Sequence, residues 1–387
     1  MTDLANALFR VDALRRIEAQ AMRLSGHDAW SLMQRAGAAA FALLRMRWPS
    51  AKHLAVVCGS GNNGGDGYVL AALARSAGLQ VTVIRVGAAP THEPATQAWA
   101  QWHAGDGRIG DDCVALADAD LVVDALFGIG LDRAPEGAAK DAIDAINRSG
   151  KPVFALDLPS GLNADTGHAP GVCVRASLTL SFIGWKRGSW TGQAAEMAGE
   201  RRLATLDLPE AAFLDVPVDA ERLTGASLAR ALPPRVRDAH KGHAGHVLVV
   251  GGDLGFGGAP LIAACAAARA GAGLVTVATR AEHVSAMLAH RPELMVRGVL
   301  SANELDELVE RADVIALGPG LGQSSWSLAL AHHACASGKP VVLDADALNL
   351  LAMQRIELSG ECVLTPHPGE AARLLGKTTA DIARDRF

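Results

Sequence analysis

Hydrophobic positions along this chain follow two periods that alternate over most of its length. Residues 10–48 repeat apolar side chains at steps of three and four, interrupted at Gly26, which is typical of two amphipathic helices. From residue 54 on, short apolar runs with the character of buried strands alternate with longer helical stretches. Strands separated by helices indicate βαβ units and a mainly parallel sheet. The pattern therefore predicts an α/β protein.

The predicted elements of the first half place the carboxyl ends of several strands at one sheet edge. Right-handed crossovers bring these ends together, and ligands of open α/β sheets bind there. Strands are predicted at 54–58, 80–86, 120–124, 152–156, 176–182 and near 203–206, with helices at 68–77, 91–104 and 136–148.

A change in composition separates the first half from a second one. Residues 207–238 contain four prolines among mixed charges, and we place the domain boundary after residue 216. The prediction is therefore two three-layer α/β/α domains, residues 1–216 and 217–387. In the second domain, strands are predicted at 246–250, 274–278, 313–317, 340–343 and 362–364, and helices at 260–270, 281–289 and 325–336.

Composition narrows the class of protein. The net charge of −5 argues against a surface dedicated to nucleic acid or to an anionic membrane. The N-terminus has no charged-then-apolar signal pattern, and the six cysteines lack metal-like spacing, as expected for thiols in a reducing compartment. We expect a cytoplasmic homo-oligomer with no nucleic-acid or membrane partner.

The turn after the first predicted strand is the strongest local signal. Residues 59–67 read Gly-Ser-Gly-Asn-Asn-Gly-Gly-Asp-Gly. Five glycines would let the backbone take positive φ and approach a ligand, and amides near a helix N-terminus favour an anion or a polarised oxygen. No Lys-Ser/Thr pair follows, so this is not a Walker phosphate loop. The alternative is that this turn only connects a strand to a helix and binds no ligand.

Two further acidic, glycine-containing turns follow later strands. One covers residues 124–132 after strand 120–124, and the other covers 157–163 after strand 152–156. A single Asp at a strand end is often a helix cap, but three such turns at one sheet edge are hard to explain as caps. Their carboxylate, hydroxyl and amide oxygens could hold a hard cation. If an ion binds there, we expect a monovalent one, and the alternative is that no ion binds.

Together these turns resemble the NAD(P)H-hydrate epimerase domain, which is Rossmann-like. The resemblance extends from 59–67, 124–131 and 156–167 to the flanking segments 32–37 and 182–188, although Gln34 stands where the family has an acid. It implies a potassium ion on Asn63, Asp124 and Ser160. It implies contact of the hydrated dinucleotide, NADHX or NADPHX, with Asn62, Asn63, Gly64, Gly65, Asp66, Gly128, Ile129, Gly130, Leu131, Asp132, Arg133, Ala134 and Asp157.

The implied reaction inverts a carbon that carries a hydroxyl group beside the ring nitrogen of the nicotinamide. Loss and re-addition of the hydroxyl pass through an iminium or a ring-opened intermediate. An Asp can move the proton, and oriented oxygens can stabilise the developing positive charge. Asp124 is the first candidate for the acid/base and Asp157 the second. Lys186 is expected to be solvated or to face a phosphate.

The second half carries a different set of motifs. Residues 240–242, 251–259, 269–277, 318–322, 344–349 and 365–370 together resemble the ADP-dependent NAD(P)H-hydrate dehydratase, a ribokinase-like fold. The resemblance implies ADP as cofactor and hydrate contacts at Ala259, Gly322 and His367. The family's Lys-Gly-x-x-Thr segment and Gly-Thr-Gly-Asp turn are absent from the 387 residues. We therefore expect a truncated dehydratase domain that is inactive and poorly stable. It would follow an active epimerase domain in the chain, so that an isomerase is joined to an incomplete lyase.

Three other functions remain open at this point. A dinucleotide-binding scaffold would bind hydrated NADH without turnover. A small-molecule kinase would transfer phosphate from ATP to an alcohol, but the absent Gly-x-Gly-Asp turn argues against it. A redox dehydrogenase is least favoured, because residues 80–88 offer Arg85 and no acid to hold a ribose.

Overall fold

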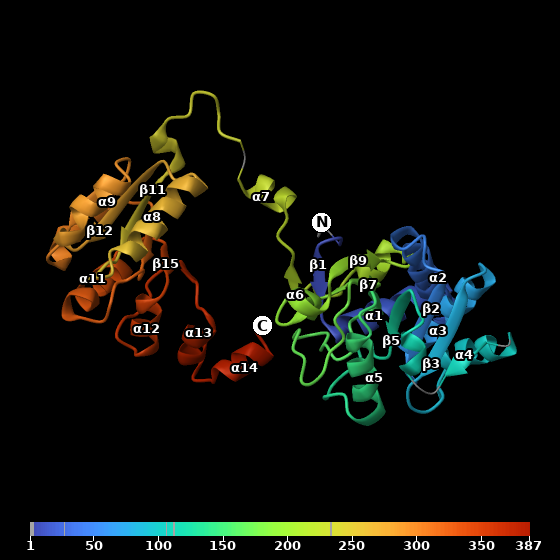
Figure 1. Cartoon of the computed structure of the whole chain (residues 1–387). Coiled ribbons are helices and arrows are strands. Elements are labelled where there is room, and N and C mark those ends of the chain that lie inside the picture. Colours follow the sequence, from blue (N-terminus) through green and yellow to red (C-terminus); the bar gives the residue numbers. More distant parts are fainter. Residues whose placement is uncertain (1–3, 27, 106, 111–112, 233) are drawn as a thin grey trace. The chain divides into compact units, whose positions relative to one another are not determined.

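The computed structural model describes residues 4–26, 28–105, 107–110, 113–232 and 234–387 (Figure 1). The chain divides into two compact units, Met1–Leu228 with Arg384–Phe387, and Ala229–Ala383. The boundary after residue 216 stays a prediction, and residues 1–3 of that predicted domain lie outside the described residues. In the structure, β10 (Ala220–Glu221) pairs with β1 (Ala7–Phe9), which keeps residues beyond 216 in the first unit.

The first unit is built on a parallel sheet in the order β4-β3-β2-β5-β6-β7-β9. Its central strands are buried on both faces, as their continuous apolar runs predict. The strands are β2 (His53–Cys58), β3 (Gln80–Arg85), β4 (Ile109–Gly110), β5 (Leu121–Ala125), β6 (Val153–Leu156), β7 (Leu178–Phe182) and β9 (Glu200–Ala204).

Helices cover both faces of this sheet. One core joins the sheet to α2 (Ala29–Arg47), α3 (Asn62–Ser76) and α4 (Ala95–Ala104). A second core joins the opposite face to α5 (Gly137–Arg148). The predicted three-layer arrangement is therefore confirmed for this unit. Short helices α6 (Ala194–Met197) and α7 (Gly225–Ala231) follow later in the chain.

The N-terminal helical region is split where the sequence predicts. Helix α1 (Val11–Ser25) ends at Gly26, whose φ of 67° closes the helix in the left-handed conformation that glycine adopts readily. Helix α2 then begins at Ala29, after Asp28 caps it by accepting a hydrogen bond from the Ser31 amide. A small sheet in the order β10-β1-β8, with β8 at Trp185–Lys186, lies beside α1 in the same unit and was not predicted.

The second unit repeats the layered plan on another parallel sheet, in the order β13-β12-β11-β14-β15-β16. Helices α8 and α9 pack on one face, and α10, α11 and α12 pack on the other. The elements are β11 (His246–Val250), α8 (Gly258–Ala270), β12 (Leu274–Thr279), α9 (Val284–His290), β13 (Met295–Gly298), α10 (Asp306–Arg311), β14 (Val314–Leu317), α11 (Ser325–Ala336), β15 (Val341–Leu343), α12 (Asp346–Ala352), β16 (Cys362–Leu364), α13 (Pro368–Leu375) and α14 (Thr379–Arg384).

The glycine-rich segment 59–67 is mostly helix. Helix α3 begins at Asn62, and no glycine of this described segment has positive φ, so the expected left-handed turn is wrong. The glycines serve close packing instead. A Cβ on Gly64 would lie 2.0 Å from the carbonyl oxygen of Gly59, and one on Gly67 would lie 2.6 Å from Cβ of Ala125. The absence of side chains lets the start of α3 sit directly against β2 and β5.

Candidate active site

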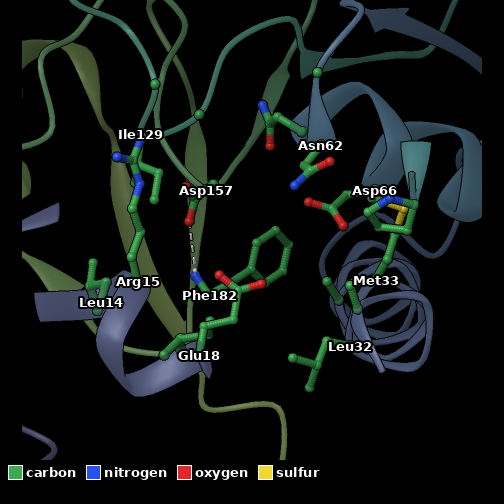
Figure 2. Close-up of a pocket in the computed structure, with 18 of the residues that line it drawn as sticks. Leu14, Arg15, Glu18, Leu32, Met33, Asn62, Asp66, Ile129, Asp157 and Phe182 are labelled. Atoms are coloured by element: carbon green, nitrogen blue, oxygen red, sulfur yellow. Dashed lines mark hydrogen bonds between the residues drawn. The ribbon is translucent and has the colours of Figure 1, made fainter. Parts of the chain in front are cut away.

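A cavity of about 470 Å³ opens at the carboxyl ends of β2, β5 and β6 in the first unit (Figure 2). Its walls come from α1, α2, the start of α3 and the loops that follow the three strands. The polar side chains in its lining include Arg15, Glu18, Asn62, Asn63, Asp66, Asp157 and Lys186. The predicted convergence of strand-end turns therefore produces a hollow of the size that holds a small ligand.

Asp157 and Lys186 form a buried ion pair in the cavity wall, and Figure 2 marks this contact. The Lys186 ammonium donates to Asp157 Oδ1, to Ser181 Oγ at 3.1 Å and to the carbonyl of Phe182 at 2.9 Å. The amide of Phe182 also donates to Asp157 Oδ1, at 3.2 Å. Only 2% of the Lys186 side chain is exposed, so the expectation of a solvated lysine is wrong. The pairing of β8 with β1 buries it.

The backbone at two cavity residues is strained. Asp157 has φ of 64° and Ile183 has φ of 69°, in the left-handed region that costs non-glycine residues free energy. The β-branched Ile183 is an outlier there, and such residues persist only where surrounding structure holds them. Both residues directly follow strands, Asp157 after β6 and Ile183 after β7, and both line the cavity.

Asp66 and Glu18 add two more carboxyl groups to the cavity. Burial raises the pKa of Asp66 well above its ordinary value, and the charges of Asp157 and Glu18 raise it further. Burial also raises the pKa of Glu18, together with the charge of Asp157. Sequence reasoning missed Glu18, because an acid in an amphipathic helix gives no signal that distinguishes it from a solvated residue.

Asp124 lies away from the cavity lining and is fully buried. Its Oδ2 accepts from the Ser160 amide at 2.8 Å, and its Oδ1 accepts from Ser160 Oγ at 2.6 Å and from the Leu126 amide at 3.2 Å. Burial raises its pKa to about 6 against these hydrogen bonds. Protein donors occupy both oxygens of this carboxylate, and Asp124 is not among the residues that line the cavity. The geometry therefore disfavours the first candidate for the acid/base and favours the second, Asp157.

The other residues implied for the first site divide into two groups. Asn62, Asn63, Asp66, Gly128, Ile129, Gly130 and Asp157 line the cavity, whereas Gly64, Gly65, Leu131, Asp132, Arg133 and Ala134 do not. Gly128 lies close to both Asp157 and Asn63. A Cβ on Gly128 would lie 3.1 Å from Asp157 Oδ2 and 3.4 Å from Cβ of Asn63. The buried amide of Asn63 has no hydrogen-bond partner for either Oδ1 or Nδ2 within the described structure.

In the second unit, Ala259 and Gly322, two of the three residues that the resemblance implies, lie near the turn around Gly320. A Cβ on Gly320 would lie 3.2 Å from Cβ of Ala259, and a Cβ on Gly322 would lie 3.1 Å from Asp253 Oδ2. The Gly322 amide donates to Asp346 Oδ2 at 2.8 Å. Asp346 is the first residue of α12, which places its carboxylate at the start of that helix.

Two features of the second unit lay beyond sequence reasoning. The carboxylate of Asp253 accepts from Arg280 Nε and Ser324 Oγ, both at 2.8 Å, and no local pattern indicates these long-range partners. His367, the third implied residue, acts as the N-cap of α13. Its Nδ1 accepts from the Gly369 amide at 3.0 Å, and most of its side chain is exposed.

Fold and cavity define an α/β enzyme of two units with an acidic ligand site at the strand ends of the first. A family model described as YjeF-related protein N-terminus matches residues 29–188, and one described as NAD(P)H-hydrate dehydratase matches residues 247–386. The Bifunctional NAD(P)H-hydrate repair enzyme Nnr of Coxiella burnetii is 46% identical over 98% of this chain and 78% of that protein. The enzyme of the same name from Escherichia coli is 41% identical over 99% of this chain and 74% of that protein. This chain belongs to the family of bifunctional NAD(P)H-hydrate repair enzymes.

Membership corrects one expectation about the second domain. The dehydratase model matches residues 247–386, and the relatives align across nearly all of this chain, so an inactive remnant finds no support. The protein therefore carries both an NAD(P)H-hydrate epimerase and an NAD(P)H-hydrate dehydratase domain. In addition, no helix among the described residues has the length and apolar character needed to cross a membrane.

Proposed function

We propose that the cavity of the first unit binds the hydrated nicotinamide ring of NADHX or NADPHX, and that Asp157 moves the proton during epimerisation. The observation that carries this assignment is the position of Asp157 in the cavity wall, with its charge matched by Lys186. A carboxyl group that lines a ligand cavity and is anchored on a rigid strand end is suited to acid/base work.

Epimerisation breaks and re-forms the bond between one ring carbon and its hydroxyl oxygen, and it requires proton transfer to and from that oxygen. The ring nitrogen can donate its electron pair as the carbon–oxygen bond breaks, provided that the departing hydroxyl receives a proton. The carboxyl group of Asp157 supplies or removes that proton, and carboxylate and amide oxygens that line the cavity stabilise the positive ring that forms. Apolar residues Leu14, Leu32 and Met33 form part of the wall, where they would limit water around the ring.

This assignment is tested by adding the purified protein to a single hydrate epimer and following the other epimer by chromatography. We expect interconversion well above the rate without protein. Binding of the hydrate without interconversion would instead support the dinucleotide-binding scaffold. Transfer of phosphate from ATP to an alcohol would support the kinase.

We further propose a potassium ion on Asn63, Asp124 and Ser160. The buried, unpartnered amide of Asn63 supports this proposal, because burying a polar group without a partner is costly. The three residues offer amide, carboxylate and hydroxyl oxygens, which suit a hard cation. When bound, the ion would add fixed positive charge at the carboxyl ends of the strands. The described parts of the chain contain no group of three or more His, Cys, Asp or Glu residues that could hold a metal, so we do not propose a transition-metal centre.

Potassium chloride is expected to raise the melting temperature of the first unit by a few degrees over choline chloride at equal ionic strength, because a ligand that binds only the folded state stabilises it. Asn63→Ala should remove this difference. Asn62→Ala, at the neighbouring exposed position, should keep it. Equal melting temperatures in the two salts for the unaltered protein would contradict the potassium site.

For the second unit we propose dehydration of the hydrate with ADP as co-substrate, at a site that includes Ala259, Gly322 and His367. The support is the match to the NAD(P)H-hydrate dehydratase model together with the motif resemblance. The residues that the resemblance associates with the nucleotide do not occur in this sequence, so no described residue is assigned to ADP. A cytoplasmic homo-oligomer remains our proposal, and the net charge of −5 supports the part of it that expects no nucleic-acid or membrane partner.

A further inference from the structure

The epimerase cavity holds more carboxyl groups than one proton transfer needs. Asp157, Asp66 and Glu18 all line it, and Lys186 is paired with Asp157 alone. Within the described structure, neither Asp66 nor Glu18 makes a side-chain hydrogen bond or an ion pair. Unpaired carboxyl groups in a largely buried position are costly unless they are protonated or have a function.

Asp66 and Asp157 reach the cavity from different walls. Asp66 extends from the start of α3, beside Met33, whereas Asp157 follows β6 and lies near Ile129. Figure 2 shows their carboxyl groups directed toward the space between these walls, with Glu18 reaching the same space from α1. Because both carboxyl groups line the same cavity of about 470 Å³ and face its open space, one small ring bound there lies between them.

An epimerase that acts on both epimers needs proton transfer on both faces of its ring. In one direction a hydroxyl leaves from the first face, and in the other direction it leaves from the second. We propose that Asp66 is a second catalytic residue, placed across the ring from Asp157, and that each carboxyl group serves one face. This inference rests on the function proposed above for the same cavity.

Inversion in one direction starts from protonated Asp66 and ionised Asp157. Protonated Asp66 gives its proton to the ring hydroxyl as the carbon–oxygen bond breaks, and the electron pair of the ring nitrogen forms the iminium. One water leaves the first face. Another water adds its oxygen to the same carbon from the opposite face and gives its proton to the Asp157 carboxylate. The product is the other epimer, Asp66 is now ionised and Asp157 protonated, and the reverse reaction uses the same groups with their roles exchanged.

The surroundings of the two carboxyl groups match these unequal resting states. Asp157 has the ammonium of Lys186 beside it, which suits the charged form. Asp66 is partly buried, with the charges of Asp157 and Glu18 nearby, which suits the neutral form, and Lys186 only partly offsets them. Burial and the charge of Asp157 raise the pKa of Glu18, and the charges of Lys186 and Arg15 only partly offset this rise. Glu18 lines the same cavity, and in its charged form it raises the pKa of Asp66.

Oxygen exchange distinguishes a second catalytic residue from a structural one. Each epimer is prepared with ¹⁸O in its ring hydroxyl, and loss of label to water is followed by mass spectrometry alongside inversion. Asp66→Asn is expected to lower inversion by about 100-fold or more. The variant should still exchange label, without inversion, from the epimer whose hydroxyl faces Asp157. Asp157→Asn should show the complementary pattern, with exchange only from the other epimer.

Asp12→Asn, an exposed change on α1, is the matched control and should leave inversion and exchange unchanged. Inversion by Asp66→Asn at the rate of the unaltered protein would overturn the inference. So would label exchange from both epimers at equal rates in that variant. If the unaltered protein does not interconvert the epimers, the proposed function itself fails, and this outcome is distinct from both.

Glu18→Gln provides a second test that does not depend on the folding of Asp66→Asn. The Glu18 charge raises the pKa of Asp66, so its removal lowers that pKa. The protonated form of Asp66 is then lost at lower pH, and the alkaline limb of the kcat/KM profile should move toward acid with little change in KM. An alkaline limb that stays in place would contradict the role of Asp66 as the proton donor.

Discussion

Asp157→Asn is expected to lower kcat for interconversion of the hydrate epimers by roughly 10²–10⁴-fold, the range that general acid/base catalysis contributes. Asn preserves the size of the side chain and can still accept from the Phe182 amide, but it cannot carry the proton. It also leaves the buried Lys186 ammonium without its carboxylate. The measurement is the initial rate from each purified epimer, with dissociation constants determined in parallel.

Asp124→Asn separates the two candidates for the acid/base. Asp124 accepts three hydrogen bonds outside the cavity, so its change should act on potassium binding and on stability rather than on proton transfer. With saturating potassium, the residual rate should exceed that of Asp157→Asn clearly. The assignment would be contradicted by an Asp157→Asn variant that keeps near-normal kcat while Asp124→Asn loses it.

Gly64→Ala is expected to destabilise the first unit by about 3 kcal/mol or more, at the upper end of the cost of overpacking. A Cβ at this position would lie 2.0 Å from the carbonyl oxygen of Gly59 and 2.8 Å from its carbon. These are backbone atoms at the end of β2, so they cannot rotate away as a side chain would. The start of α3 must then move away from the sheet edge that carries the cavity. Urea unfolding, with a probe in the first unit, measures the effect.

Gly61→Ala is the control for this prediction, in the same segment. No atom lies within 4 Å of a Cβ at Gly61, and its φ of −95° is accessible to alanine. We expect a change of about 1 kcal/mol or less, as for the loss of a glycine N-cap. Equal destabilisation by the two substitutions would show that the close approach of Gly64 to Gly59 does not control the stability of this turn.

Much of the fold could be predicted because parallel sheets leave a strong pattern. Apolar runs at 54–58, 120–124 and 152–156 fall within one residue of β2, β5 and β6, since both faces of these strands are buried. Strands β1, β8 and β10 are two or three residues long, and β13 is largely exposed, so neither length nor alternation identifies them. Their pairing depends on contacts distant in sequence.

The location of the cavity could also be predicted, whereas the roles of individual side chains could not. Strand-end turns identify one edge of the sheet, and the structure brings Asn63, Gly128 and Asp157 together there. Whether Asp124 or Asp157 lines the cavity depends on hydrogen bonds from Ser160, which lies 36 positions from Asp124. The burial of Lys186 likewise depends on the pairing of β8 with a distant strand.

We propose that the first-unit cavity holds the hydrated ring between two carboxyl-bearing walls. A crystal structure of the Asp157→Asn protein with bound NADH hydrate tests it most directly, because this variant should bind the substrate and turn it over slowly. We expect the ring in the cavity, with its hydrated carbon between the residue-157 amide and the Asp66 carboxyl group. A ring bound outside this cavity, with Asp66 and residue 157 beyond hydrogen-bond reach of the hydroxyl, would contradict it.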